Sequence, residues 1–110
     1  MVTAKKDLFE PELQEVADLF RVLSHPARLQ ILLFLAETKI CISGDISEEL
    51  PLSRTTVNQH LKELKEAGLI RGQVEGARVN YCLNPLGVQE MNKYITKFLS
   101  RIQIEPDICC

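Results

Sequence analysis

Pro51-Leu52-Ser53-Arg54-Thr55-Thr56-Val57-Asn58-Gln59-His60-Leu61-Lys62 is the stretch of sequence that decides the fold. Ser53 is a favoured N-cap residue and Gly68 suits the position just past a helix end, so we predict a helix between them. Two faces of this helix share the spacing i, i+3, i+4, i+7. The apolar face carries Val57, His60, Leu61 and Leu64, and the polar face carries Thr55, Asn58, Gln59 and Lys62.

Three further helices are predicted upstream of this one. The apolar spacing predicts a first helix from about Pro11 to Leu23. Ser24 is expected to cap a short, buried second helix that opens at Pro26. Ser43 is expected to cap a third helix, which stops at Pro51 because proline breaks helices.

Downstream, the apolar period changes from that of a helix to two. Residues 69–74 and 78–83 alternate at this period, and the short turn Glu75-Gly76-Ala77 between them predicts a β-hairpin. Asn84 and Pro85 are expected to cap and open a last helix. The sequence thus predicts a mainly α fold with five helices and a small hairpin wing, which is a winged helix-turn-helix. We expect one domain over residues 1–105 and a flexible tail over 106–110.

The composition is that of an ordinary globular protein, with 110 residues, of which 45% are hydrophobic and 25% charged. Apolar runs fall far short of the roughly 20 residues of a membrane helix, and no signal peptide is visible, so we expect a cytoplasmic protein without a membrane partner. The net charge is −2, but residues 53–82 carry five basic and three acidic groups and form the net-positive part of the chain. Such a local block matters more for DNA binding than the total charge.

The polar face of the capped helix suits base recognition in the major groove of DNA. Arginine can bind guanine, asparagine and glutamine can bind adenine, and threonine offers a hydroxyl and a methyl group. Helix N-terminal amides suit phosphates, and wing arginines suit the neighbouring backbone. A polar face on an isolated helix is usually only a solvated face, but here the cap, the charge block and the hairpin agree. The predicted DNA contacts are Ser53, Arg54, Thr55, Thr56, Asn58, Gln59, Lys62 and Arg78, with Arg71 as a further wing candidate.

The first and last helices carry apolar faces that a small core with a wing does not fully cover. These faces either complete the core of one chain or meet a second copy, and we expect a homodimer. A twofold dimer presents its recognition helices about 34–36 Å apart to an inverted repeat in double-stranded DNA. The predicted interface residues are Leu13, Val16, Phe20, Ile95, Phe98 and Leu99.

Three motifs together resemble the ArsR/SmtB family of metalloregulatory repressors. They are residues 23–29 (Leu-Ser-His-Pro-Ala-Arg-Leu), the stretch 51–62 quoted above, and residues 76–81 (Gly-Ala-Arg-Val-Asn-Tyr). The resemblance spans about residues 13–100 and implies a homodimer that represses its own operon and leaves its operator when an effector binds. We find no nucleophile–base arrangement, phosphate loop or paired carboxylates, so we expect no enzyme.

Four cysteines in a reducing compartment are more readily ligands, sensors or core residues than disulfides. Cys41 lies in a segment similar to the one that holds the ligands of the family's arsenic- and cadmium-sensing branch. Ser43 stands where a second cysteine is usual, and Gly44 is an extra residue. Cys109-Cys110 is a vicinal pair at the end of the chain. The alternatives are that Cys41 is a small buried hydrophobe and that the pair belongs to an ordinary tail.

With Cys41, Cys109 and Cys110 as three soft ligands, the expected effector is As(III) or Sb(III), and we expect no obligatory cofactor. Two alternatives stay open: a repressor that responds to thiol oxidation or persulfides, and one that responds to Cd, Pb or Zn. Cys82 is interpreted as structural, with a redox role as the alternative. His25 is expected to make a local hydrogen bond and His60 to pack on the apolar face, so neither is predicted to bind a metal.

Overall fold

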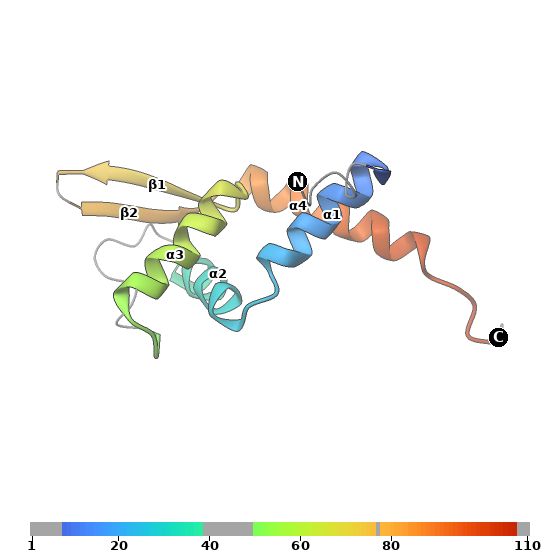
Figure 1. The fold of residues 1–110 in the computed structure, drawn as a ribbon, viewed down its shortest axis with the longest axis horizontal. Coiled ribbons are helices and arrows are strands. Elements are labelled where there is room, and N and C mark those ends of the chain that lie inside the picture. The colour runs from blue at the N-terminus through green and yellow to red at the C-terminus, as the bar shows by residue number, and fades with distance from the viewer. Residues whose placement is uncertain (1–7, 39–49, 77, 108–110) are drawn as a thin grey trace.

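The computed structural model describes residues 8–38, 50–76 and 78–107. In chain order they form α1 (Pro11–Val22), α2 (Pro26–Thr38), α3 (Arg54–Glu66), β1 (Ile70–Glu75), β2 (Arg78–Leu83) and α4 (Pro85–Arg101). The molecule is elongated, with extents of 56 × 37 × 27 Å. Figure 1 shows α2, α3 and the hairpin at one end, which we call the helix-turn-helix region, and α1 beside α4 toward the other, which we call the arm.

The described residues hold four helices, where five were expected. The missing element is the helix expected from Ser43 to Leu50, which falls almost entirely on residues 39–49, outside the described ones. The mainly α class with one hairpin is confirmed. α1 ends one residue earlier than expected, and α2 is a full 13-residue helix rather than a short one.

The turn between α1 and α2 differs from the prediction. Ser24 does not cap α2, because its hydroxyl donates to the carbonyl oxygen of Arg21 at 2.6 Å, at the end of α1. His25 caps instead, since its Nδ1 accepts from the backbone N–H of Ala27 at 3.0 Å. A serine hydroxyl can serve the helix before it or the helix after it, and only the backbone of the turn decides between them. Pro26 opens α2 as predicted.

The core lies in the helix-turn-helix region, where α2, α3 and the base of the hairpin meet. Its fully buried side chains include Ile31, Leu64 and Leu69. No residue of α4 is buried, and the contribution of this helix to the core is the partly buried Met91. The buried members are Val22, Ile31, Leu35, Val57, Leu61, Leu64, Leu69 and Ile70.

A Schellman motif closes the C-terminus of α3. The N–H of Leu69 donates to the carbonyl oxygen of Leu64 at 3.1 Å, and the N–H of Gly68 donates to that of Lys65 at 3.0 Å. Gly68 has a φ of +80°, which glycine adopts without the strain of a side chain. This turn directs the chain from α3 straight into β1.

The hairpin is antiparallel, with Ile70 paired to Leu83 at its base and Glu75 paired to Arg78 at its tip. β2 has the predicted bounds, whereas β1 begins and ends one residue later than predicted. The turn is therefore only two residues long, and Gly76 takes the positive φ of +64° that such a turn requires.

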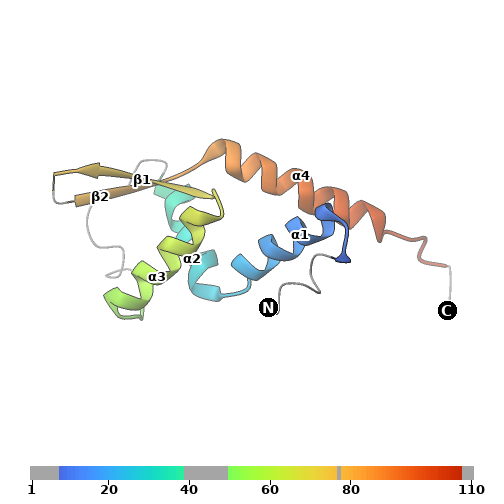
Figure 2. The same ribbon diagram turned by 45° about the horizontal axis from the view of Figure 1, so that its top comes forward.

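The start of α4 is fastened to the end of α3. Asn84 precedes α4 but does not cap it with its side chain, in contrast to the prediction. Its Nδ2 donates to the carbonyl oxygen of Gly68 at 3.0 Å, and its N–H donates to that of Leu69 at 2.9 Å. Gly87 lies so close to Gly68 that a Cβ there would overlap the Gly68 carbonyl oxygen. From this Gly68–Gly87 joint, α4 runs along the arm to the far end of the molecule (Figure 2).

In the described parts of the chain, no single helix is both long and apolar enough to cross a membrane. α1 and α2 reach that length and hydropathy only as a pair, across a bend of 86°.

Candidate nucleic-acid interface

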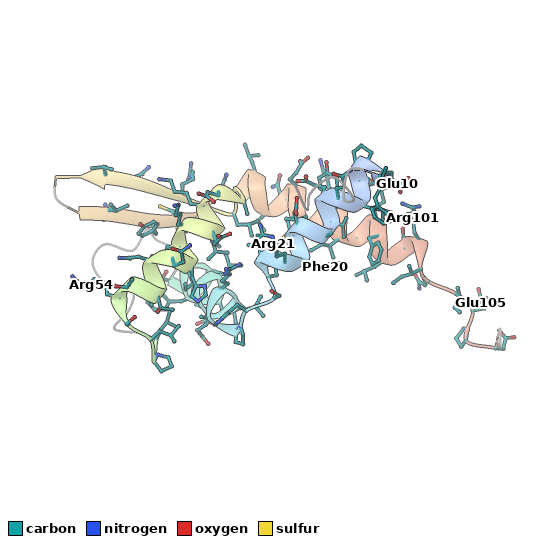
Figure 3. All side chains as sticks on the ribbon, viewed as in Figure 1. Glu10, Phe20, Arg21, Arg54, Arg101 and Glu105 are labelled. Atoms are coloured by element: carbon teal, nitrogen blue, oxygen red, sulfur yellow. The ribbon has the colours of Figure 1, made fainter. Side chains whose placement is uncertain are left out.

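α3 begins at a serine cap, as predicted. The Ser53 hydroxyl accepts from the N–H of Thr56 at 3.3 Å and donates to the Thr56 hydroxyl at 3.0 Å. Other N–H groups of the first turn point out of the helix end, where the helix dipole favours an anion such as a phosphate. Figure 3 shows Arg54 at this end of α3, on the side away from the arm.

The two faces of α3 separate as the spacing predicted. The four residues of the apolar face, Val57, His60, Leu61 and Leu64, are all buried. Because the core holds this face, the polar face is presented in a fixed orientation. The exposed residues on it are Ser53, Arg54, Thr55, Thr56, Asn58, Gln59 and Lys62.

An arginine and two histidines tie the back of α3 to α2. Arg28 Nε donates to His60 Nδ1 at 3.1 Å, and Arg28 Nη1 donates to the carbonyl oxygen of Val22 at 3.3 Å. The ring centroids of His25 and His60 are 4.3 Å apart. The local roles predicted for the two histidines are confirmed, but the sequence reasoning missed Arg28, although it stands in the 23–29 motif. This residue links the end of α1, the start of α2 and the middle of α3.

The surroundings of His60 favour its neutral form. Burial lowers its pKa from the ordinary value of 6.5, the charges of His25 and Arg28 lower it further, and Glu63 opposes them. Nδ1 accepts from Arg28, so the neutral ring carries its proton on Nε2, which is buried without a hydrogen-bond partner among the described residues. His60 is therefore a packing and acceptor residue. The described residues contain no group of three or more His, Cys, Asp or Glu that could hold a metal ion.

An ion pair joins α1 to the flank of α3. Arg21 Nη1 lies 3.4 Å from Glu63 Oε2, and the side chain of Arg21 is largely exposed. Such a pair adds little stability. It does place a positive charge beside an acidic residue that would otherwise repel phosphates next to Lys62. No sequence pattern predicts this contact, because 42 residues separate the partners.

The wing adds positive charge next to α3. Arg71 of β1 is exposed, as its candidate role requires. Lys65 of α3 extends toward the same strand, since its Nζ would lie 3.4 Å from a Cβ placed at Gly72. Arg78, a predicted DNA contact, pairs with Glu75 in the β-ladder at the tip of the hairpin. The side chain of Arg78 lies outside the described part of the structure.

Three of the four cysteines, the predicted ligands Cys41, Cys109 and Cys110, lie outside the described residues. Cys82 of β2 is only 6% exposed, which agrees with a structural role. It is also disulfide-bonded, in contrast to the expectation that the thiols stay reduced. That expectation came from the compartment, whereas a disulfide depends on which cysteines the fold brings together.

The apolar faces of α1 and α4 cover each other only in part. The rings of Phe20 and Phe98 meet edge to face, with centroids 6.0 Å apart. Val16 is buried within a single chain, which favours for this residue the alternative that it completes the monomer core. Phe20 and Leu99 remain 42% and 52% exposed. The other predicted interface residues, Leu13, Ile95 and Phe98, are half-buried.

Comparison with known proteins points to one family. Residues 25–71 match the family described as "Bacterial regulatory protein, arsR family". A cadmium resistance transcriptional regulatory protein, a CadC homolog from Staphylococcus aureus, is 33% identical over 89 residues, which cover 80% of this chain and 73% of that protein.

Two solved structures share the fold. The transcriptional repressor BigR from Xylella fastidiosa has a TM-score of 0.61 and 27% identity, and the match covers 93% of this chain and 100% of that one. A homodimeric winged helix-turn-helix DNA-binding domain, Mb0332 from Mycobacterium bovis, has a TM-score of 0.62 at 24% identity and covers 89% of both chains. The predicted winged helix-turn-helix architecture is therefore the architecture of these neighbours.

Proposed function

Because this chain belongs to the arsR family of bacterial regulatory proteins, we propose that it represses transcription as an operator-bound homodimer and is released when its thiolates bind As(III) or Sb(III). Members of the family are DNA-binding transcription regulators and not enzymes, so the protein is a transcription regulator. The proposal adds the dimer, the operator and the effector.

One observation carries the DNA part of the proposal, namely the chemistry of the exposed face of α3. A face that is merely solvated usually mixes acidic and basic side chains, as surface helices do. From Ser53 to Lys62 the exposed side chains are basic, amide or hydroxyl, and none is acidic. The first acidic residue, Glu63, is paired with Arg21. This distribution of side chains suits DNA, because DNA is a polyanion and its base edges offer hydrogen-bond donors and acceptors.

The chemistry of each side chain suggests its role on DNA. Arg54 suits guanine O6 and N7, Asn58 and Gln59 suit adenine, and the threonines suit a thymine methyl or a phosphate. Ser53, the α3 amides and Lys62 suit the phosphates that position the helix. Arg71 and Arg78 of the wing suit the adjacent backbone or minor groove.

The arm supports a dimer. Its exposed phenylalanine and leucine side chains form an apolar surface that a second copy can cover in a twofold arrangement. Such a dimer would present two α3 helices about one helical turn of DNA apart, roughly 34–36 Å. The operator would then be an imperfect inverted repeat.

The DNA part is tested with a fluorescent duplex that carries the DNA upstream of the protein's own coding sequence. Gln59→Ala should weaken binding by roughly ten- to a hundredfold, since a base contact contributes about 1–3 kcal/mol. Gln89→Ala, which alters the same residue type on the exposed surface of α4, is the matched control and should bind like wild type. Failure of the wild-type protein to bind the duplex at low salt would refute the proposal.

The effector part rests on thiol chemistry and on the family resemblance of the Cys41 segment. Three thiolates suit As(III) or Sb(III) because these ions are soft. The proposed ligands are Cys41, Cys109 and Cys110, all of which lie outside the described residues.

Arsenite titrated into the complex of reduced protein and duplex tests the effector part. Wild type should leave the DNA, whereas Cys41→Ser and a chain that ends at Asp107 should stay bound. Cys82→Ser is the control and should still respond. Release of Cys41→Ser at the wild-type arsenite concentration would contradict the proposed ligands.

Two other effectors have an observation in their favour. A repressor that responds to thiol oxidation is favoured by the disulfide at Cys82. A repressor that responds to Cd, Pb or Zn is favoured by the relative named for cadmium resistance. The same complex titrated with peroxide, with a persulfide and with Cd(II), Pb(II) or Zn(II) separates them, because the true effector should act at the lowest concentration.

A further inference from the structure

Lys65 continues the polar face of α3 beyond the residues that the helical spacing assigned to DNA. It follows Asn58 by seven residues and Lys62 by three, and these spacings place the three side chains on one side of a helix. Lys65 is exposed, as Asn58 and Lys62 are. The side of α3 that is proposed to face DNA therefore extends to the last turn of the helix.

The last turn of α3 directs its charges to two different sides. Glu63 and Glu66 line a hollow that α3 shares with α1. Lys65 extends toward β1, which packs against α3 (Figure 1). Within the described part of the chain, the side chain of Lys65 has no hydrogen bond or ion pair. Its ammonium group is therefore available to an anion on the side of the wing.

Gly72 of β1 leaves the room that Lys65 needs to reach the wing. A Cβ at Gly72 would lie 3.4 Å from Lys65 Nζ, and it would crowd Val79 Cγ1 at 3.3 Å and Tyr81 Cε1 at 3.4 Å. Gly72 does not have a positive φ, so the backbone does not require a glycine here. A glycine inside a strand often marks a place that another group approaches closely. Here that group is the Lys65 ammonium, and we call the place the Gly72 notch.

We propose that Lys65, seated at the Gly72 notch, binds a phosphate of the DNA strand that passes between α3 and the wing. The inference rests on the proposed function, because a strand passes there only if α3 lies in the major groove and the wing lies on the adjacent backbone. The contact carries no sequence information. It sets the register of α3 in the groove, as phosphate contacts do.

A role in packing alone predicts a different result. A lysine also covers apolar surface with its methylene groups, here beside Tyr81. Methionine keeps such a stem and lacks the charge, whereas arginine keeps the charge. Lys65→Met and Lys65→Arg therefore separate a phosphate contact from packing.

The salt dependence of DNA binding tests the inference on the full-length protein. The affinity for the upstream duplex is measured by fluorescence anisotropy between about 50 and 200 mM salt. One phosphate contact contributes about 0.9 to the slope of log K against log salt, so Lys65→Met should lower the slope by about 0.9 and weaken binding roughly 15-fold near 50 mM and roughly fourfold near 200 mM. Lys65→Arg should bind like wild type. Lys93→Met, which alters an exposed lysine of α4, is the matched control and should leave slope and affinity unchanged.

A side chain in the Gly72 notch should act like the loss of the charge. Gly72→Val should lower the slope as Lys65→Met does, because valine occupies the place of the ammonium while it suits a strand. The two substitutions together should lower the slope no further, since both remove the same contact. If circular dichroism shows that Gly72→Val fails to fold, Gly72→Ala with its smaller side chain replaces it.

The outcomes distinguish this inference from the proposed function. A wild type that does not bind the duplex refutes the proposed function. If wild type binds and Lys65→Met keeps the wild-type slope, only the inference is overturned. It is also overturned if Lys65→Met melts at a lower temperature and binds more weakly by the same factor at every salt concentration, because the lysine then acts through folding. A wild-type slope in Gly72→Val overturns the role of the notch.

Discussion

In the helix-turn-helix region a cluster of apolar side chains is buried together with Val22 from the end of α1, whereas none of the 17 residues of α4 in the arm is buried. Leu64 of α3 is completely buried and Leu99 of α4 is 52% exposed, although both lie on the apolar face of an amphipathic helix. The difference shows that one chain is enough to hold α3 in place. The arm is left with apolar surface that a second copy can cover.

The largest effect should follow from a cavity in the helix-turn-helix region. Leu64→Ala should lower the free energy of unfolding by about 2–5 kcal/mol, because it removes a fully buried side chain. Leu99→Ala is the matched control in the arm and should cost less. Urea unfolding of both variants at a protein concentration where wild type is monomeric measures this. Equal losses would contradict the division into a complete and an incomplete region.

A charge in the arm should act on assembly. Leu99→Lys should raise the dimer dissociation constant at least tenfold, or about 1.4 kcal/mol, because a buried ammonium at the interface lacks a partner. Leu86→Lys alters an exposed leucine at the other end of the same helix and should leave the constant unchanged. Sedimentation over a concentration series measures the dimer dissociation constant of both variants. An unaltered dimer dissociation constant in Leu99→Lys would show that the interface lies elsewhere.

A smaller effect is expected from the cap of α3. Ser53→Ala should cost about 1 kcal/mol of unfolding free energy, because it leaves the Thr56 N–H without its acceptor. Ser100→Ala at the end of α4 is the control, since its hydroxyl donates only to the exposed carbonyl oxygen of Lys97. Thermal unfolding followed by circular dichroism compares them. Because we propose that Ser53 also contacts a phosphate, Ser53→Ala should bind DNA more weakly as well.

The pH dependence of stability should depend on His60. Its folded-state pKa is lowered from 6.5, mainly by burial, so the unfolded chain takes up a proton more readily. Stability should therefore be full above pH 6.5, fall as the pH drops below it, and level off once the pH is below the folded-state pKa. Urea midpoints between pH 8 and pH 5 should show this fall in wild type and a shallower one in His60→Gln.

The smallest effect is expected from the ion pairs of the arm. Arg101 Nη1 lies 3.0 Å from Glu10 Oε1 (Figure 3), and Lys97 Nζ lies 2.8 Å from Glu12 Oε1. Exposed pairs contribute about 0–1 kcal/mol, so Arg101→Ala should hardly change the unfolding midpoint. High salt should reduce even this difference. A loss as large as that of Leu64→Ala would mean that charge, and not apolar contact, holds the arm.

The sequence predicted α3 in full because every signal for it is local. Its cap, its two faces and its terminal glycine lie within 16 residues, and the structure confirms each of them. Asn84 was misinterpreted because its side chain bonds Gly68, 16 residues earlier, rather than the helix that it precedes. The disulfide of Cys82 and the Arg21–Glu63 pair were missed for the same reason. Residue chemistry predicts what a side chain can do, and tertiary contacts decide with which partner.

The site itself was predictable to the same extent. The exposed residues on α3 follow from helical periodicity, since the face opposite a buried stripe must be exposed. The role of Arg28 could have been predicted from the 23–29 motif. Arg28 lies just after the start of α2, and this helix start faces the buried His60 of α3. The exposure of the arm could not be predicted residue by residue. Val16 and Leu99 share an apolar pattern, and only the crossing of α1 with α4 buries the first and exposes the second.

Because the Gly68–Gly87 joint fixes one end of α4 to the end of α3, a small change of angle at the joint becomes a large displacement at the other end of α4. A rotation of about 5° at the joint would move the far end of this helix, some 25 Å away, by roughly 2 Å. In a twofold assembly the same rotation occurs in both subunits, so the spacing between the two reading helices changes by a comparable step while no helix unfolds. A methyl group at Gly87 would overlap the Gly68 carbonyl oxygen, so α4 would have to shift relative to α3, and in a twofold assembly the two α3 helices would then no longer match consecutive grooves.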